Sequence, residues 1–122
     1  MPSMNEVMDR VGRTMPNTIP EKDQARWLVT LDGRVYEEVI KADEPAGLPV
    51  KNWPEDGDKP LLADSPYDSI YDLYLTAMIC FALGEYSDYN NIAEQFERTF
   101  RDFRAWWRRG HVPKQSVLIS GI

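Results

Sequence analysis

Few side chains in this sequence are of the kinds that catalyse reactions or bind metals, and their spacing does not bring them together. His111 is the single histidine, and no cysteine or carboxylate motif stands near it at metal-ligand spacing. Cys80 is the single cysteine, and without a positioned histidine it is not a candidate nucleophile. A glycine-rich phosphate loop, a GxSxG elbow and an HExxH motif are all missing. We therefore expect no enzymatic activity, no metal and no cofactor.

The side chains best suited to a function are tryptophans and arginines. Trp106 and Trp107 are adjacent, so on a helix they point about 100° apart and cannot both lie centrally on one narrow stripe. Either one of them is exposed in a protein interface, or both cover a small core with arginines above them. We take as candidate interface residues Trp53, Arg101, Arg104, Trp106, Arg108 and Arg109.

Charge is unevenly distributed along the chain. The formal net charge is −6, yet residues 92–114 hold six basic residues against three acidic ones. Because these arginines alternate with carboxylates, the pattern favours a solvated helix face. A solvated face is one option, and the other is a helical regulatory or DNA-associated module that uses the face from Arg98 to Arg109. DNA binding is the harder requirement to meet, because it needs several phosphates neutralised together.

Helical periodicity predicts two helices before residue 42. A capping box from Ser3 to Glu6 begins the first, which should end around residues 13–15. A second such pattern, from Thr18 to Glu21, begins a helix of roughly residues 20–41. Gly33 lies inside it, and we favour a close helix crossing there over a bend.

The longest helical pattern runs from Ser65 to Arg109. Ser65 as N-cap, with Pro66 at the first helical position, predicts a third helix to about residue 83 that is apolar around most of its circumference and forms the core. Around residues 84–91 the chain either kinks or turns back as a helical hairpin. In the fourth helix we expect ion pairs of Glu94 with Arg98 and of Glu97 with Arg101.

A long proline-rich connection occupies residues 43–64. Loops of this length are usually functional or mobile, so it is either a contact arm or a loop held over the core by its apolar residues. Brief strand pairing of residues 48–51 with 60–63 is a further option. The apolar residues in question are Leu48, Val50, Trp53, Leu61 and Leu62.

These elements fit a single all-α domain, a small bundle of about four helices over residues 1–122 with a flexible tail at 113–122. A single cysteine permits no disulfide within the chain, which suits a reducing cytoplasm. We expect a soluble protein without a membrane partner, since no signal peptide pattern precedes the domain and its longest apolar run is far too short to span a bilayer.

Several short segments, spread over about residues 9–114, carry a family resemblance. They are WLVTLDGRVYEEV (27–39), PYDSIY (66–71), Gly84–Glu85, YNN (89–91) and WRRGH (107–111). In these segments the chain resembles head-tail connector, or adaptor, proteins encoded in the structural modules of tailed phages and Firmicutes prophages.

The resemblance implies a small helical structural protein that assembles as a ring between portal and tail. Its partners would be the portal, tail-completion proteins and other copies of itself, and DNA would pass through the ring without sequence-specific contact. The implied location is the bacterial host cytoplasm during assembly and then the head-tail junction of the virion. No catalytic residues are implied, because such connectors act by assembly.

Overall fold

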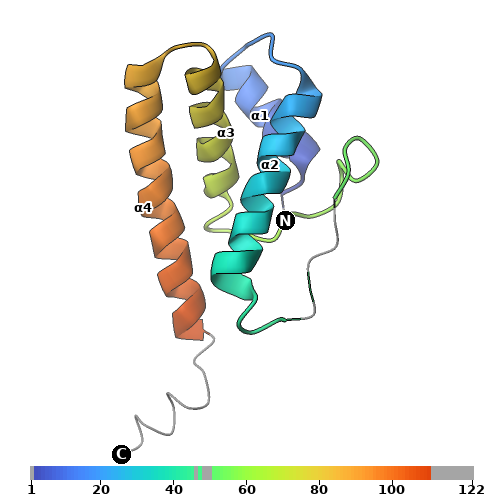
Figure 1. The fold of residues 1–122 in the computed structure, drawn as a ribbon, viewed down its shortest axis with the longest axis vertical. Coiled ribbons are helices and arrows are strands. Elements are labelled where there is room, and N and C mark those ends of the chain that lie inside the picture. Colours follow the sequence, from blue (N-terminus) through green and yellow to red (C-terminus); the bar gives the residue numbers. More distant parts are fainter. Residues whose placement is uncertain (1, 46, 48–50, 111–122) are drawn as a thin grey trace, which may run out of the picture.

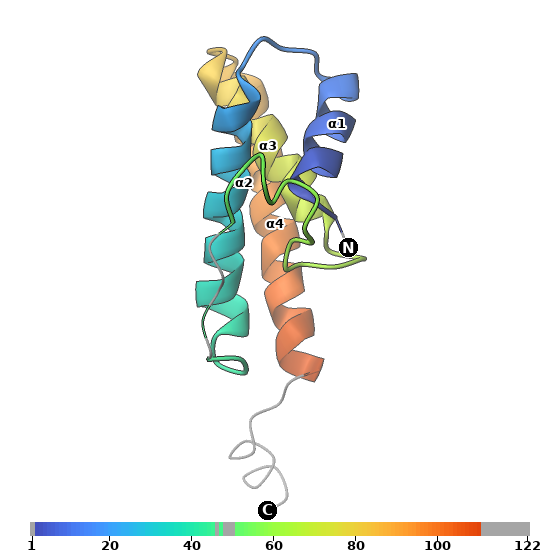
Figure 2. The same cartoon turned by 90° about the vertical axis from the view of Figure 1, so that its right-hand side faces the viewer.

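The chain is an all-α bundle in the computed structural model, which describes residues 2–45, 47 and 51–110. The helices are α1 (Met4–Thr14), α2 (Glu21–Val35), the π-helical turn η1 (Tyr36–Ile40), α3 (Ser69–Ala82) and α4 (Tyr86–Gly110). In Figures 1 and 2, α2, α3 and α4 run alongside one another, and α1 packs on α2 and α3. The only β pairing within the described ranges is an isolated bridge between Ser3 and Pro60.

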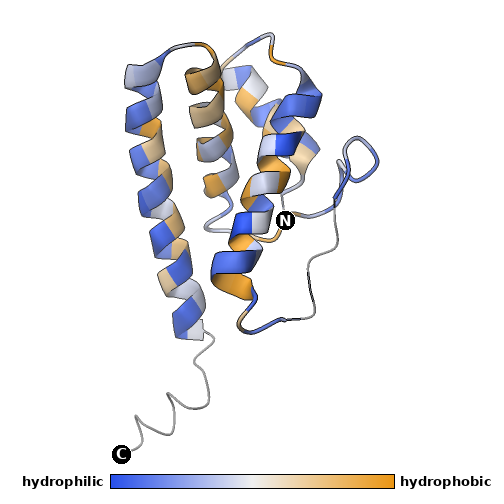
Figure 3. Cartoon of the chain, viewed as in Figure 1, coloured by the Kyte–Doolittle hydropathy of each residue, from blue (hydrophilic) through white to orange (hydrophobic). Residues whose placement is uncertain are grey.

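The core lies between the apolar faces of these helices. Helix α3 is the most hydrophobic of them in Figure 3, whereas α4 carries a narrower apolar stripe. The prediction of a buried third helix is confirmed over most of its length. It is wrong for Phe81, which is 52% exposed, and for Ala82, because the last turn of α3 lies at the hairpin turn, where few neighbours cover it. The largest core side chains include Met4, Leu28, Leu31, Tyr71, Phe100 and Phe103.

Helix α1 begins as predicted. The Ser3 side chain accepts a hydrogen bond from the Glu6 amide at 3.2 Å, so one of the unpaired donors of the first turn is satisfied. The second predicted capping box is wrong, because the N-cap of α2 is Pro20, which makes no side-chain cap. Asn17 orders this turn instead, since its side-chain oxygen accepts from the Ile19 amide at 3.0 Å.

Helix α3 begins at Ser69, three residues later than predicted, because its N-cap is Asp68 in place of Ser65. The reason is a turn centred on Asp64, whose side chain accepts from the Ser65 amide and whose carbonyl accepts from the Tyr67 amide, both at 2.9 Å. The chain then reverses at Gly84, which adopts a φ of 78°. Of the two options at this point, the structure therefore has the turn, with α3 and α4 packed as a helical hairpin.

Two other expectations for the helices fail. No atom lies within 4 Å of a Cβ placed on Gly33, so this glycine does not mark a close crossing; the irregularity follows it in η1. Glu97 does not pair with Arg101, because it contacts Arg34 of α2 at 3.3 Å. The predicted pair of Arg98 with Glu94 is present at 3.4 Å.

The connection from η1 to α3 is held on the bundle in its described parts. The buried carboxylate of Asp32, in α2, accepts from the Tyr71 hydroxyl at 2.7 Å and from the Leu62 amide at 3.0 Å, and Lys51 contacts it at 3.2 Å. Leu61 is buried, and its amide donates to the Pro2 carbonyl at 2.8 Å. These contacts favour the held loop over the free contact arm. Most of the first strand of the predicted pairing, residues 48–50 with Leu48 and Val50, lies outside the described residues, as does the predicted tail at 113–122.

Candidate protein interface

One of the two adjacent tryptophans is exposed and the other is not. Trp106 is 43% exposed, and its ring stacks on Phe103 at 6.3 Å and meets Tyr67 at 5.5 Å between centroids. Trp107 is half-buried against the core, and its indole N–H donates to Asp43 at 2.7 Å. Because neighbouring aromatic rings hold Trp106 on one side, it presents a fixed apolar surface to solvent on the other.

Beside these tryptophans lies a cavity of about 330 Å³. Helix α4 forms one wall, the end of η1 a second, and the last part of the connection the floor. The size is at the low end for ligand pockets, and such a space suits a few side chains of a partner. Its lining is mostly apolar with two carboxylates at the rim: Ile40, Glu44, Pro60, Leu61, Leu62, Asp64, Phe103, Trp106 and Trp107.

The four predicted arginines do not form one patch with Trp106. Arg104 contacts Glu38 of η1 at 3.3 Å, so its charge is compensated within the bundle. Arg101 and Arg108 are seven residues apart and share a face of α4 that points away from Trp106. Arg109 is three residues from Trp106 and lies on its side of the helix. Within the described residues, no ion pair involves Arg101, Arg108 or Arg109.

Trp53, the remaining predicted interface residue, belongs to a different part of the molecule. Its indole N–H donates to the side chain of Asn5 at 3.0 Å, and Asn5 also bonds Asp58 at 2.9 Å. Trp53 therefore helps to hold the connection against the start of α1. We define the α4 end as residues 106–109, and Trp53 is not part of it.

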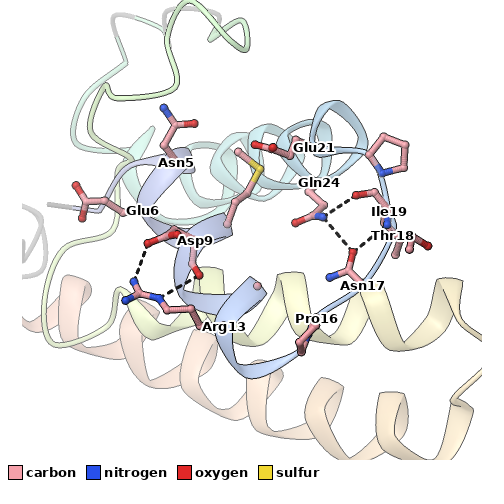
Figure 4. A pocket seen from close by; sticks show the side chains of 13 residues that line it. Asn5, Glu6, Asp9, Arg13, Pro16, Asn17, Thr18, Ile19, Glu21 and Gln24 are labelled. Atoms are coloured by element: carbon pink, nitrogen blue, oxygen red, sulfur yellow. Dashed lines mark hydrogen bonds and ion pairs between the residues drawn. The ribbon is translucent and has the colours of Figure 1, made fainter.

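A second cavity, of about 1020 Å³, lies between α1 and the turn into α2 (Figure 4). Polar side chains line much of it, and several bond to one another. Arg13 contacts Asp9 at 2.7 Å, and the Gln24 amide donates to Asn17 at 3.3 Å and to the Ile19 carbonyl at 2.9 Å. Because these groups are paired, the cavity offers few free polar partners to a ligand.

Sequence reasoning missed an exposed aromatic patch at the opposite end of α4. We define the hairpin tip as residues 81–88, which join α3 to α4. Besides Phe81, it exposes 46% of Leu83 and 59% of Tyr86, and the ring of Phe81 contacts that of Tyr86 at 5.5 Å. The signal was available, because Leu83 and Tyr86 flank Gly84 and Glu85 in a turn that few neighbours can cover.

Other chemistry is sparse in the described part of the chain. No group of three or more His, Cys, Asp or Glu residues there could hold a metal ion, and His111 lies outside it. Cys80 is buried, and burial, together with the charges of Glu85 and Asp88, raises the pKa of its thiol, which disfavours the reactive thiolate. None of the described helices combines the length and apolar character needed to cross a membrane.

In comparisons with known proteins, no family model, no curated protein and no solved structure matches this chain.

Proposed function

We propose that this chain is a structural subunit of a phage or prophage head-tail connector, which assembles as a ring between the portal and the tail. The observation that carries the proposal is Trp106, an exposed tryptophan held rigidly on Phe103 and Tyr67 beside an apolar cavity. A preorganised aromatic anchor of this kind is typical of protein interfaces, because it buries a large apolar area at little entropic cost. The spaced sequence segments that resemble connector proteins supply the identity of the assembly.

The proposed partners are the portal, tail-completion proteins and further copies of the chain. The proposed location is the host cytoplasm during assembly and then the head-tail junction of the virion. DNA passes through the assembly without sequence-specific contact. This role needs no catalytic residue and no cofactor, because the work of a connector is done by its interfaces.

The test is co-sedimentation of the purified chain with portal particles from the same phage. We expect the chain to sediment with the particles and Trp106→Ala to weaken its binding about 30-fold, the equivalent of a hot spot worth about 2 kcal/mol. Arg26→Ala, which removes an exposed side chain of α2, is the control and should bind like the wild type. A chain that stays in the supernatant at all concentrations would count decisively against the proposal.

The second candidate is the DNA-associated or regulatory module. Arg101 and Arg108 favour it, because they share one face of α4 and make no ion pair within the described residues. With Arg109 they offer three cations, so log affinity for DNA should fall with log salt at a slope of about −3. Reversing Arg101 and Arg108 to glutamate should then abolish binding. DNA binding that is unaffected by this double change would exclude the Arg98–Arg109 face.

A further inference from the structure

The cavity beside Trp106 lies close to the last described residue of α4. Its lining includes Trp106 and Trp107, and Gly110 ends the helix one turn later. The rise along the axis from Trp106 to Gly110 is about 6 Å. The residues that follow Gly110 therefore leave the bundle within a short distance of the cavity.

The sequence continues past Gly110 with residues 111–122, which lie outside the described ranges. They read HVPKQSVLISGI, with three consecutive apolar residues at 117–119, a lysine at 114 and no aspartate or glutamate. The cavity has the complementary composition, since its lining is mostly apolar and the carboxylates of Glu44 and Asp64 stand at its rim. Pro113 disfavours helical geometry in the residue before it, so the sequence provides a point at which the chain can leave the axis of α4.

The 111–122 segment is long enough to return to the cavity. Val117 is seven residues beyond Gly110, and an extended chain of that length spans roughly 23 Å at most. Lys114, four residues beyond Gly110, reaches about 13 Å by the same measure. Both distances exceed the one helical turn that separates Gly110 from Trp106.

We infer that the 111–122 segment folds back on its own chain and places Val117–Ile119 in the cavity, against the exposed ring of Trp106. Removal of these apolar side chains from water drives the docking. Lys114 then lies near Glu44 and Asp64, and this charge complementarity favours one placement of the segment.

Tethering favours this occupant over a separate molecule. A cavity of about 330 Å³ accommodates only a few side chains, which is a small contact compared with a stable interface between two proteins. A segment joined by a short linker, however, has an effective concentration on the order of millimolar at its site. A contact too weak to hold a second molecule is therefore still populated within one chain.

Docking of the segment also regulates the site. A partner that binds at Trp106 must first displace residues 117–119, so the docked segment lowers the affinity for that partner. This consequence rests on the proposed function, whereas the docking itself does not.

The test is NMR spectroscopy of the full chain without any partner. We expect NOEs between the methyl groups of residues 117–119 and the ring of Trp106, with relative intensities that do not change on dilution. Leu118→Ser should abolish them and shift the Trp106 indole N–H resonance, which is identified by its loss in Trp106→Phe. Ser120→Ala is the matched control in the same segment and should leave the NOEs and the resonance as in the wild type.

A charge reversal tests the placement of Lys114. Lys114→Glu should weaken the NOEs, because the new carboxylate lies beside the acidic rim, and the same reversal of the exposed Lys22 at the start of α2 should not. Equal effects of the two reversals would contradict the placement of Lys114 at the rim.

Two outcomes would overturn the docking. The first is an absence of NOEs to Trp106 together with an indole resonance that Leu118→Ser does not move, as expected for a free tail. The second is a set of NOEs that disappears on dilution, which would assign the contact to a second copy.

Portal particles separate this inference from the proposed function. If both hold, Leu118→Ser should co-sediment with the particles at lower concentration than the wild type. Equal portal binding by the two proteins would reject the regulation alone. Docking without any portal binding would reject the connector role alone.

Discussion

At the scale of single residues, the Asp32 carboxylate links three parts of the chain. It is 1% exposed, and its partners are Tyr71 of α3, Lys51 and the Leu62 amide of the connection. Its charge is tolerated in the interior because both oxygens are bonded and Lys51 is close. Neither helical periodicity nor any motif predicted this role. Asp32 lies between two core positions of α2, where the sequence alone suggests an ordinary acidic residue of a helix.

Removing this carboxylate should destabilise the fold strongly. We expect Asp32→Ala to cost about 3–5 kcal/mol of unfolding free energy, because Lys51 and the Tyr71 hydroxyl lose their buried partner. Asp23→Ala is the matched control in the same helix. Its ion pair with Arg26 is exposed, so the cost should stay below about 1 kcal/mol. Urea denaturation measures both, and equal losses would show that Asp32 is not the central link.

The Tyr71 hydroxyl should make stability depend on pH in the alkaline range. Burial and the neighbouring Asp32 charge raise its pKa above the ordinary value, so it keeps its proton when folded. The unfolded chain releases that proton above about pH 10, which favours unfolding. The advantage of wild type over Tyr71→Phe should therefore be present at neutral pH and shrink above pH 10. A difference in unfolding free energy that stays constant across this range would contradict the assignment.

At the scale of elements, helical periodicity predicted the number and order of the helices, because an amphipathic helix must bury one stripe. Helix starts were less predictable. Ser3 caps α1 as expected, but side-chain bonds of Asn17 and Asp64 to nearby amides form turns where a capping box at Thr18 and an N-cap at Ser65 had been expected. Such local competition between turn and cap depends on geometry that residue types alone do not specify.

Two glycines test which backbone positions matter. Gly84 has a φ of 78° at the hairpin turn, so Gly84→Ala should cost about 1–2 kcal/mol. Gly33 is helical and has open space where a Cβ would lie, so Gly33→Ala should stabilise the protein by about 0.5–1 kcal/mol. Thermal unfolding of the two variants should shift the melting temperature in opposite directions. Shifts of the same sign would contradict either the positive φ of Gly84 or the open space beside Gly33.

At the scale of the whole molecule, the candidate site was only partly predictable. Adjacent tryptophans and arginine enrichment directed attention to the α4 end, and of the two options for this pair the structure has the one in which a single ring, Trp106, is exposed. Trp53 and Arg104 were also candidate interface residues, but they do not join Trp106 in one patch. Their tertiary contacts with Asn5 and Glu38 decide where those side chains lie. The hairpin tip went unnoticed because apolar residues of α3 were all assigned to the core.

The central claim, a subunit that forms a ring at the portal, is tested most directly by electron microscopy of the chain mixed with portal particles of the same phage. We predict a ring of this protein at one end of each particle, and its loss in Trp106→Ala. Bare portal particles in the presence of saturating folded protein would contradict the account.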